Sequence, residues 1–519
     1  MKKIIIKNTG VISLGTNASR ILGLVRDVLI AKLFGTTYEA GAFVVAFTIP
    51  NMLRDFVGEG AANAAFVPVL AEYKVKEEKT EFWKVANIIQ NLLAIVLIVL
   101  SILGIFLSPI IVRIIAPGFI KEAGAIELTV RLTRFIFPYI FLIGLTAYGM
   151  SVLNILGHFA IPAFGPVLLN ISLILSAIFL CPRIGVIGLV FGVLLGGILQ
   201  LAIQFPWLYK NGFRLRWYVD ILHPVAKKVI ILLFPRVIGT AVYQINVLVD
   251  RMLASLFWIV GTGGVPALYF SYRLIQYPLA VFSTALATAT LPMMSSEVAG
   301  SNMPNLKRIV CFSLRTIMFI LVPSSVGLAV LGKPIIKILF ERGAFDAYST
   351  AVTYQALLFY TIGLFAYGSI RILATTFYSM KDTVTPVKVA ACSLMVNIAL
   401  NLILMWPLKI GGLALATSIA AIFNLAVLYL ILRKRLGDLE DKELFASAAK
   451  IILASIPMGI IVYLLSKSCF EEGIRMSALS STMWLLFIVG VGIIIYIIAA
   501  IMLGMEEPRK MFKWIFKKA

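Results

Sequence analysis

Long apolar runs, separated by short polar or Pro/Gly-rich breaks, are the dominant pattern along the chain. A helix needs about 20 largely apolar residues to cross a bilayer. The clearest runs contain no charged residue across a full span, as from Ile88 to Ile111, from Ile184 to Tyr209 and from Met483 to Met505. In total the pattern predicts fourteen spans, centred near residues 21, 52, 98, 145, 171, 197, 240, 280, 320, 365, 396, 422, 457 and 493. We therefore expect an all-α polytopic membrane protein.

Composition agrees with this fold class and excludes a water-soluble protein. Of the 519 residues, 61% are hydrophobic and 13% are charged, whereas soluble domains are about 45 to 50% apolar and about 25% charged. The mean hydropathy is +1.00. The longest connections between spans have only the length of a single helix, so we expect no soluble domain with separate chemistry.

The net charge of +22 comes from 46 Lys and Arg against 24 Asp and Glu. With the N-terminus inside, the cytoplasmic connections hold 26 of these basic residues and the opposite connections hold 10. Because Lys and Arg favour the cytoplasmic side, this bias predicts an even number of spans with both termini in the cytoplasm. The basic excess then faces the anionic inner leaflet, and nucleic acid is not an expected partner.

Metal chemistry is not expected. The chain has four scattered cysteines and two histidines, which form no ligand spacing or disulfide framework. The N-terminus starts with basic residues but has no small-residue cleavage site, and its apolar run contains Arg20 and Arg26. We therefore interpret it as a retained first span.

A weak internal repeat relates the two halves of the chain at a spacing of 224 residues. Pro68 matches Pro292, and Pro162 matches Pro386. Each copy contains six predicted spans, so both copies enter the membrane from the same side and form two lobes around a central cleft. The predicted parts are an N-lobe (1–215, helices 1–6), a C-lobe (216–440, helices 7–12) and helices 13–14 with a basic cytoplasmic tail (441–519).

Charges inside the spans are the candidate functional residues, since an arginine at a helix centre costs about 2.5 to 3.5 kcal/mol and normally faces water or a partner. In the first span Asn17, Arg20 and Asp27 share one helical face. Asp27 could therefore form a structural pair with Arg20, whereas Arg26 is expected to project elsewhere, toward the second lobe. Arg20 and Arg26 are both candidates for substrate binding.

The second predicted span, from Ile49 to Leu70, contains Pro50, Gly58 and Gly60. A weakened helix is tolerated in a membrane where it lines protein or water, so this span is a candidate cavity wall that moves. Asn51 and Asp55 lie on one face, flanked by Arg54 and Glu59. The two carboxylates are candidate proton acceptors, or they simply neutralise Arg54.

Further basic residues occur in the second half of the chain. Arg273 lies just ahead of a proline, in the repeat counterpart of the region before Arg54. Asp250 and Arg251 could form an intramembrane pair or cap a helix end. The other arginines lie closer to span ends, where snorkelling to the interface explains them: Arg131, Arg134, Arg236, Arg315 and Arg371.

Several arginines around one cleft favour a phosphate-bearing substrate. A guanidinium stays charged and offers a planar fork that matches phosphate oxygens. A cationic drug would instead require a cleft dominated by carboxylates. This difference favours an anionic ligand for the chain.

Four segments of the chain resemble the MurJ (MviN) family of bacterial lipid II flippases. They are ASRILGLVRD in the first span, PNMLRDFVGEGAANAAFVPVLAEY in the second, LVDRMLAS from Leu248 to Ser255, and YRLIQYP ending at Pro278. The resemblance extends over nearly the whole chain. It implies the fold of the multidrug/oligosaccharidyl-lipid/polysaccharide exporter superfamily, with two six-helix lobes and two further helices that form a groove for a polyprenyl tail.

The resemblance also implies a substrate and its contacts. The substrate would be lipid II, the undecaprenyl-diphosphate-linked peptidoglycan precursor, moved from the inner to the outer leaflet of the bacterial inner membrane. The implied substrate contacts are Arg20, Arg26, Arg54 and Arg273, with Asp27 and Glu59 as acidic companions. The family often has an acidic residue directly before the last of these arginines, where this chain has Tyr272, and Asp250 is expected to supply the negative charge. The residues expected to line the cavity or couple charge are Asn17, Asp27, Asn51, Asp55, Glu59, Asp250 and Arg251.

We expect a transporter rather than an enzyme, working by alternating access without a cofactor and coupled to an ion or to the membrane potential. The expected partners are lipid II, membrane lipids and the cell-wall synthesis or division machinery. The alternatives are a flippase for another polyprenyl-linked oligosaccharide and a cation-coupled drug exporter of the same superfamily. A membrane-embedded glycan polymerase is disfavoured because the predicted outer loops are short and both histidines lie near the cytoplasmic side.

Overall fold

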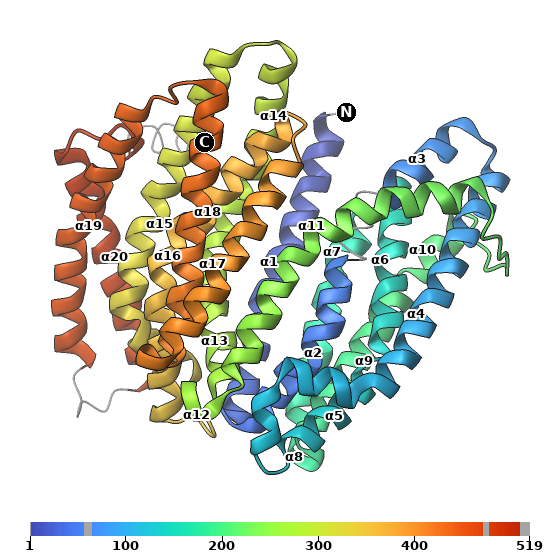
Figure 1. Cartoon of the computed structure of the whole chain (residues 1–519), viewed down its shortest axis with the longest axis horizontal. Coiled ribbons are helices and arrows are strands. Elements are labelled where there is room, and N and C mark those ends of the chain that lie inside the picture. Colours follow the sequence, from blue (N-terminus) through green and yellow to red (C-terminus); the bar gives the residue numbers. More distant parts are fainter. Residues whose placement is uncertain (1, 57–64, 471–476, 509–519) are drawn as a thin grey trace. The chain divides into compact units, whose positions relative to one another are not determined.

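The computed structural model describes residues 2–56, 65–470 and 477–508; the side chains of residues 2–13, 53 and 234–239 are not described. This part of the chain is helical and contains no β-strand, which confirms the all-α prediction (Figure 1). The helices up to residue 210 are α1 (Lys2–Phe34), α2 (Tyr38–Arg54), α3 (Val67–Lys76), α4 (Lys79–Ile115), η2 (Pro117–Lys121), α5 (Ala125–Ile136), α6 (Tyr139–Ile155), α7 (Ala160–Phe179), α8 (Cys181–Ile184), α9 (Ile187–Ala202) and α10 (Phe205–Lys210). The later helices are α11 (Pro224–Ala254), α12 (Phe257–Val260), α13 (Gly264–Pro278), η3 (Leu279–Ser283), α14 (Thr284–Ala299), α15 (Met303–Phe340), α16 (Ala347–Ser379), α17 (Val384–Leu408), α18 (Ile410–Leu436), α19 (Asp441–Phe470) and α20 (Ala478–Met502).

The chain divides into two compact units. The first unit comprises Met1–Leu256 with the short segment Arg342–Phe345, and the second comprises Phe257–Glu341 with Asp346–Ala519. Helix α11 therefore packs with the first unit. The lobes expected from the sequence, 1–215, 216–440 and 441–519, remain a prediction.

Helix boundaries follow the predicted repeat. Helices α4 and α15 begin at Lys79 and Met303, which lie 224 residues apart. Helices α7 and α17 begin at Ala160 and Val384, at the same spacing. The repeat seen in a few residue matches is therefore a repeat of whole helices.

Eleven helices or helix pairs in the described residues are long and apolar enough to span a membrane. Each contains one of the predicted span centres. The other three centres, near residues 21, 52 and 240, fall in α1, α2 and α11, which are helical but carry charged residues. A multi-pass membrane protein is thus supported, and the total of fourteen spans stays a prediction.

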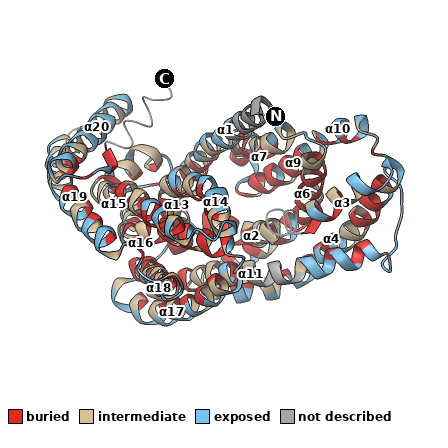
Figure 2. Cartoon of the chain, turned by 90° about the horizontal axis from the view of Figure 1, so that it is seen from above, coloured by how far each residue is buried: buried red, intermediate tan, exposed pale blue. Residues whose placement is uncertain are grey.

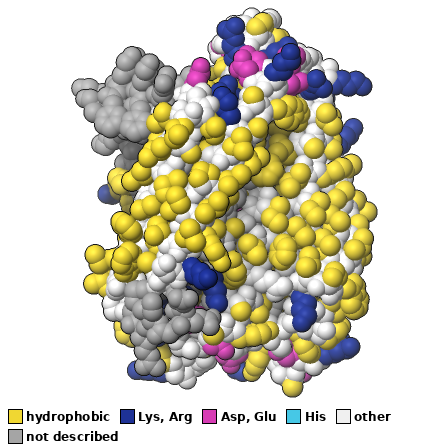
Figure 3. All heavy atoms as spheres, turned by 90° about the vertical axis from the view of Figure 1, so that its left-hand side faces the viewer, with side chains coloured by type: hydrophobic (Ala, Val, Ile, Leu, Met, Phe, Trp, Pro, Cys, Tyr) yellow, Lys and Arg dark blue, Asp and Glu magenta, His cyan; other side chains and the backbone are white. Residues whose placement is uncertain are grey.

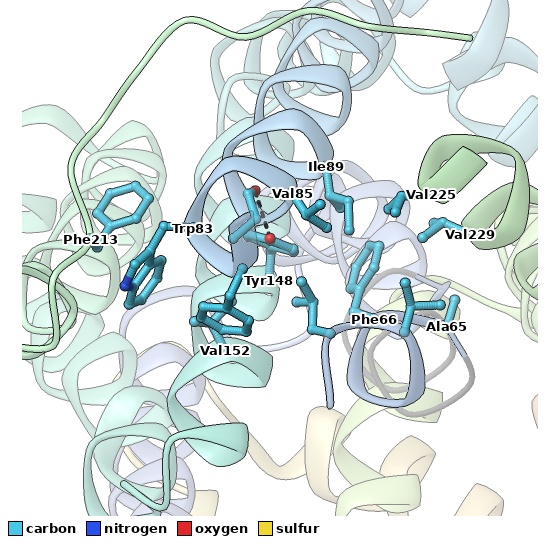
Figure 4. Close-up of a cluster of buried hydrophobic side chains, with 14 of the residues drawn as sticks. Ala65, Phe66, Trp83, Val85, Ile89, Tyr148, Val152, Phe213, Val225 and Val229 are labelled. Atoms are coloured by element: carbon cyan, nitrogen blue, oxygen red, sulfur yellow. Dashed lines mark hydrogen bonds between the residues drawn. The ribbon is translucent and has the colours of Figure 1, made fainter. Parts of the chain in front are cut away.

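A buried apolar cluster joins α3, α4, α6 and α11 in the first unit (Figure 4). Phe66 stands edge-on to Tyr148 with the ring centroids 5.3 Å apart. The Tyr148 hydroxyl donates to the Ala86 carbonyl at 2.8 Å, so its polar end is satisfied inside the cluster. Val225 and Val229 of α11 belong to the same cluster. This packing fixes the start of α11 against the first unit.

In the second unit, α16 has buried residues along its whole length, and Figure 2 shows this unit from above with buried residues on its helices. Glycines allow the neighbours of α16 to approach closely: a Cβ at Gly363 would lie 2.8 Å from Ser418 Cα on α18. Helices α15, α19 and α20 share a further buried cluster that includes Ile451 and Tyr496.

The outer side of α19 and α20 is apolar, with exposed residues such as Ile452, Ile456, Leu486 and Ile494. On this side of the molecule, hydrophobic side chains cover the middle, while charged side chains gather mainly toward the two ends (Figure 3). An apolar band with polar ends matches a bilayer and its headgroup regions.

Gly412 near the start of α18 tests the close packing of this unit. A Cβ there would lie 2.1 Å from the Leu404 carbonyl oxygen, which is backbone and cannot move aside cheaply. We expect Gly412→Ala to lower the apparent unfolding temperature in detergent, with a destabilisation of about 1 to 3 kcal/mol. Gly490→Ala in α20 is the control, because a Cβ there meets nothing within 4 Å. An equal loss in both variants would contradict the packing explanation.

Asp382 holds the turn before α17, outside the membrane-spanning helices. Its carboxylate accepts the backbone N–H groups of Val384 and Thr385 at 3.0 and 2.9 Å, and Arg435 Nη1 lies 2.5 Å away. Burial opposes ionisation of this carboxyl group. The hydrogen bonds from Thr385 and the interaction with Arg435 outweigh that effect and lower the pKa of Asp382 to about 2.

This pKa predicts acid sensitivity. Because the folded-state pKa lies below the ordinary value of 3.8, ionised Asp382 stabilises the fold above that pH, and the contribution disappears as the pH falls from 3.8 to about 2. We expect the unfolding temperature of the native protein to fall more steeply over this window than that of Asp382→Asn. Parallel pH profiles for the two proteins would contradict the assignment.

Candidate functional site

Arg26 and Asp27 form a buried ion pair on α1. Arg26 Nη2 and Nε lie 2.7 and 3.0 Å from Asp27 Oδ1, and 10% and 5% of the two side chains are exposed. Arg26 Nη1 also donates to Asn170 Oδ1 on α7 at 2.9 Å. Asn170 Nδ2 in turn donates to the Ser19 carbonyl at 2.9 Å, so this one amide joins α7 to two places on α1.

The expectation that Arg26 projects away from Asp27 is wrong. Neighbouring positions on an α-helix point about 100° apart, but the long arginine side chain bends back to the carboxylate. The reason is that a carboxylate buried without a partner is far more costly than the bent side chain. Of the other two residues predicted on this helix, Arg20 is half-buried and Asn17 is exposed.

Arg54 ends α2 and pairs with the next residue, Asp55. Arg54 Nη2 and Nε lie 3.1 and 3.3 Å from Asp55 Oδ1. The buried Gln244 of α11 donates to Asp55 Oδ2 at 2.9 Å. Some 40% of the Arg54 side chain is exposed, against 23% for Asp55. Asp55 therefore neutralises one edge of a guanidinium that still has access to its surroundings.

Asn51 is half-buried one turn before Asp55. Glu59 lies outside the described residues, so its expected interaction with Arg54 stays a prediction.

Arg251 joins α11 to α2. Its Nη1 donates to the Val44 carbonyl at 2.9 Å and to the Thr48 hydroxyl. Asp250 accepts a hydrogen bond from Asn246, one turn earlier on α11, at 3.4 Å. Together with the bond between Gln244 and Asp55, the bonds of Arg251 connect α11 to α2 and to the residue that follows it.

In the second unit, Arg273 lies on α13 beside an aromatic ring. Its Nη2 donates to the Tyr269 hydroxyl at 3.2 Å, and its Nη1 donates to Gln276 Oε1 at 3.3 Å. The guanidinium carbon is 5.0 Å from the Tyr269 ring centroid, within range of a cation–π interaction. Tyr272, which stands where the family often has an acid, packs edge-on against Tyr360 at 5.8 Å.

A π-helical turn follows the candidate arginine of each unit. In the first unit Asp55 and Phe56 have π-helical geometry, where the described residues end, and in the second unit the turn is η3, which starts at Leu279. Asp55 and Leu279 are 224 residues apart and therefore correspond in the repeat. Such turns widen a helix locally and occur often at functional sites.

Comparison with known proteins places this chain in a family. A family model described as lipid II flippase MurJ matches residues 30–487. The chain belongs to the MurJ family. A Vibrio cholerae serotype O1 protein described as a probable lipid II flippase MurJ is 33% identical over 518 residues, which cover 98% of this chain and 97% of that protein.

Solved structures agree with membership in the MurJ family. A structure described as lipid II flippase MurJ in an inward closed conformation matches with a TM-score of 0.79 and 30% identity, covering 94% of this chain and 97% of that one. An inward-facing multidrug resistance MATE family transporter of the MOP superfamily has a TM-score of 0.68 at 16% identity, covering 82% and 96%. The second match shows a shared fold only. The family expected from the sequence is thus confirmed.

In this MurJ-family chain Arg315, which is expected to snorkel to the interface, forms two ion pairs. Its Nη2 pairs with the buried Glu507 at 2.7 Å and its Nη1 with Glu443 at 3.2 Å. Ser447 donates to Glu507 at 3.1 Å. The arginine therefore ties α15 to α19 and to the residues that follow α20. Its partner carboxylates lie more than a hundred residues away in the chain, so sequence position alone hid this role.

Sequence reasoning also missed Asn170 and Gln244. Both are uncharged amides in apolar helices, and they position the charged residues Arg26 and Asp55. A polar amide inside an apolar run was the available signal, since such side chains usually bond to another helix.

In each unit the candidate arginines carry guanidinium groups, the side-chain type that suits an oxyanion. Arg20, Arg54 and Arg273 are half-buried cations, while Arg26 is enclosed. Within the described residues, no group of three or more His, Cys, Asp or Glu could hold a metal ion. The roles of the predicted site residues in binding and charge coupling stay predictions.

Measurements of protein stability can distinguish a structural role of the Arg26–Asp27 pair from a role in substrate binding. We expect Arg26→Ala to lower the apparent unfolding temperature strongly, because Asp27 stays buried without its cation, a loss of about 3 to 5 kcal/mol. The double variant Arg26→Met with Asp27→Asn should recover most of it, because no buried charge remains. Thermal unfolding of the detergent-purified proteins measures both.

Arg20→Ala on the same helix is the control and should change the unfolding temperature little, because Arg20 is half-buried rather than enclosed. If the double variant is as unstable as Arg26→Ala, the ion pair is not the source of the loss.

Proposed function

We propose that this chain is a lipid II flippase of the bacterial cytoplasmic membrane. It moves the undecaprenyl-diphosphate-linked peptidoglycan precursor from the inner to the outer leaflet. The observation that carries this proposal is a half-exposed guanidinium, Arg54, held on one edge by Asp55 in a chain of the MurJ family. A second candidate function has no comparable observation behind it.

The chemistry of the headgroup explains why such a site is needed. A diphosphate cannot cross about 30 Å of hydrocarbon unaided at a useful rate, because its charge loses its water. Arginine replaces that water with charge-assisted hydrogen bonds and remains cationic in an apolar setting. Arg20, Arg54 and Arg273 are the residues proposed to meet the diphosphate and sugar, whereas Arg26 positions α1 through Asp27 and Asn170.

The mechanism we propose is alternating access through a cationic cavity. The headgroup enters from the cytoplasmic side while the polyprenyl tail stays in lipid, and the cavity then opens outward. In this scheme the diphosphate competes with Asp55 for Arg54. Asp55 keeps its bond to Gln244 on α11, so substrate binding acts on the contact between α2 and α11.

No cofactor is part of this proposal. An ion or the membrane potential supplies the driving force, since each elementary charge moved across 100 mV is worth about 2.3 kcal/mol. Both termini face the cytoplasm, and the cell-wall synthesis or division machinery consumes the product. Binding and translocation involve no covalent step, so the chain acts as a transporter and not as an enzyme.

The test is lipid II exposure on the outer leaflet of cells whose only flippase is this chain. Arg54→Ala and Arg20→Ala should each reduce exposure roughly tenfold to a hundredfold, the range for losing a hydrogen bond to a charged group. Arg131→Ala removes an exposed arginine from α5 and is the matched control. Normal lipid II exposure in both site variants, at normal protein levels, would overturn the cationic site.

A further inference from the structure

The connection between α10 and α11 carries an unusual density of exposed apolar side chains. From Arg214 to Leu222 the sequence reads RLRWYVDIL, with apolar and polar residues alternating over most of its length. Leu215, Trp217, Ile221 and Leu222 are 64%, 73%, 69% and 93% exposed. We call residues 213–222 the α10–α11 strip. Exposed apolar clusters of this kind mark interaction surfaces.

Hydrogen bonds and a buried side chain fix the backbone of the strip against α4. Its backbone bonds to two buried asparagines of α4: Asn87 Oδ1 accepts the Arg216 N–H at 3.0 Å, and Asn91 Nδ2 donates to the Arg216 and Tyr218 carbonyls at 2.8 and 3.1 Å. Phe213 is buried with its ring 5.6 Å from that of Trp83, on the border of the cluster in Figure 4. The apolar residues that follow are therefore presented outward by a fixed backbone.

Cations stand among these apolar residues and lie against aromatic rings. The Arg214 guanidinium lies 3.6 Å from the Tyr209 ring centroid, and Lys210 Nζ lies 5.5 Å from that of Trp207. Arg216 donates to the Tyr218 hydroxyl at 3.4 Å. The one carboxylate of the strip, Asp220, accepts the backbone N–H of Leu222. Basic and aromatic side chains together are typical of the headgroup level of a membrane.

A shallow apolar pocket, open over most of its extent, adjoins the strip. It has a volume of about 430 Å³ and is lined by Ala202, Phe205, Pro206 and Tyr209. Ala202 is the last residue of α9, whose side chains Leu195 and Ile198 are exposed and apolar. The pocket is thus continuous with the surface of a membrane-spanning helix, and its rim carries the ring on which Arg214 rests.

We propose that the α10–α11 strip is a binding site for anionic phospholipid at the membrane interface. The apolar side chains of the strip enter the boundary between headgroups and acyl chains, Arg214 and Arg216 bind the phosphate, and the pocket at the end of α9 takes an acyl chain. A lipid fits better than a protein partner because the apolar surface is continuous with a membrane span and its cations match anionic headgroups. The site lies outside the arginines assigned to the carried substrate.

Spin labels test whether the strip enters the bilayer. Label Leu215→Cys or Ile221→Cys in the full chain carrying Cys392→Ser and Cys469→Ser; Cys181 and Cys311 are buried and stay. In nanodiscs containing phosphatidylglycerol, both labels should collide with oxygen more than with a water-soluble nickel complex. A label at the exposed Lys434→Cys, at the end of α18, should show the reverse. If the labels on the strip collide with the nickel complex more than with oxygen, as expected for the label at position 434, the strip does not enter the bilayer.

A charge variant tests the headgroup assignment. Native mass spectrometry of the full chain, titrated with phosphatidylglycerol or phosphatidylcholine, should show a preference for the anionic lipid. Arg214→Gln with Arg216→Gln should reduce that preference by roughly 30-fold, about fivefold for each arginine near an anionic surface. Lys307→Gln with Arg308→Gln removes the same charge from α15 and should leave the preference unchanged. Equal losses in the two double variants, or no loss in the first, would overturn the assignment.

Discussion

A charged side chain inside an apolar helix has to find a counter-charge or a polar partner, and the contacts of the first unit follow from this constraint. Arg26 is satisfied by its neighbour Asp27, and Arg54 by its neighbour Asp55. In both pairs a neutral amide from another helix completes the arrangement, Asn170 in one case and Gln244 in the other. Leaving any one of these groups unmatched would cost more than most apolar contacts contribute.

This solution has a mechanical consequence. Each pair is local to one helix, but each amide belongs to a different helix, so neutralising a charge also ties two helices together. The Asn170 amide joins α7 to α1, and Gln244 joins α11 to α2. A ligand that engages the arginine of such a pair therefore acts on a contact between helices. The atoms that bind the ligand are therefore also those that connect the helices. A carrier needs this link because ligand binding has to change how its helices are arranged.

The sequence predicted the fold class, the family and the spacing of the repeat, because hydrophobic runs and repeated prolines depend on local sequence. Neutralisation of Arg54 was one of two alternatives for Asp55, and the ion pair between these adjacent residues agrees with it. Prediction failed where the partner is distant or the geometry is flexible. Arg26 bends back to the adjacent Asp27, and its further partner Asn170 lies 144 residues away. The network around Arg315 depends on Glu443 and Glu507. A single sequence shows that a charge needs a partner but not which helix supplies it.

Three arginines of the first unit differ in how far their guanidinium groups are exposed and in what they contact. Arg26 is enclosed and fully engaged by protein groups, so it can hold a helix but offers little to a ligand. Arg54 is engaged on one edge and exposed on the rest, which leaves it able to exchange a carboxylate for a phosphate. Arg214 rests on an aromatic ring at the edge of an apolar surface, where water still competes for its charge. How strongly and how reversibly an arginine binds its partner therefore varies with its exposure. An enclosed arginine cannot release its partner without leaving a buried charge unmatched. A residue that must bind and release a lipid headgroup in every cycle has to lie between these extremes, and among the arginines of the first unit with an identified ion pair, Arg54 does.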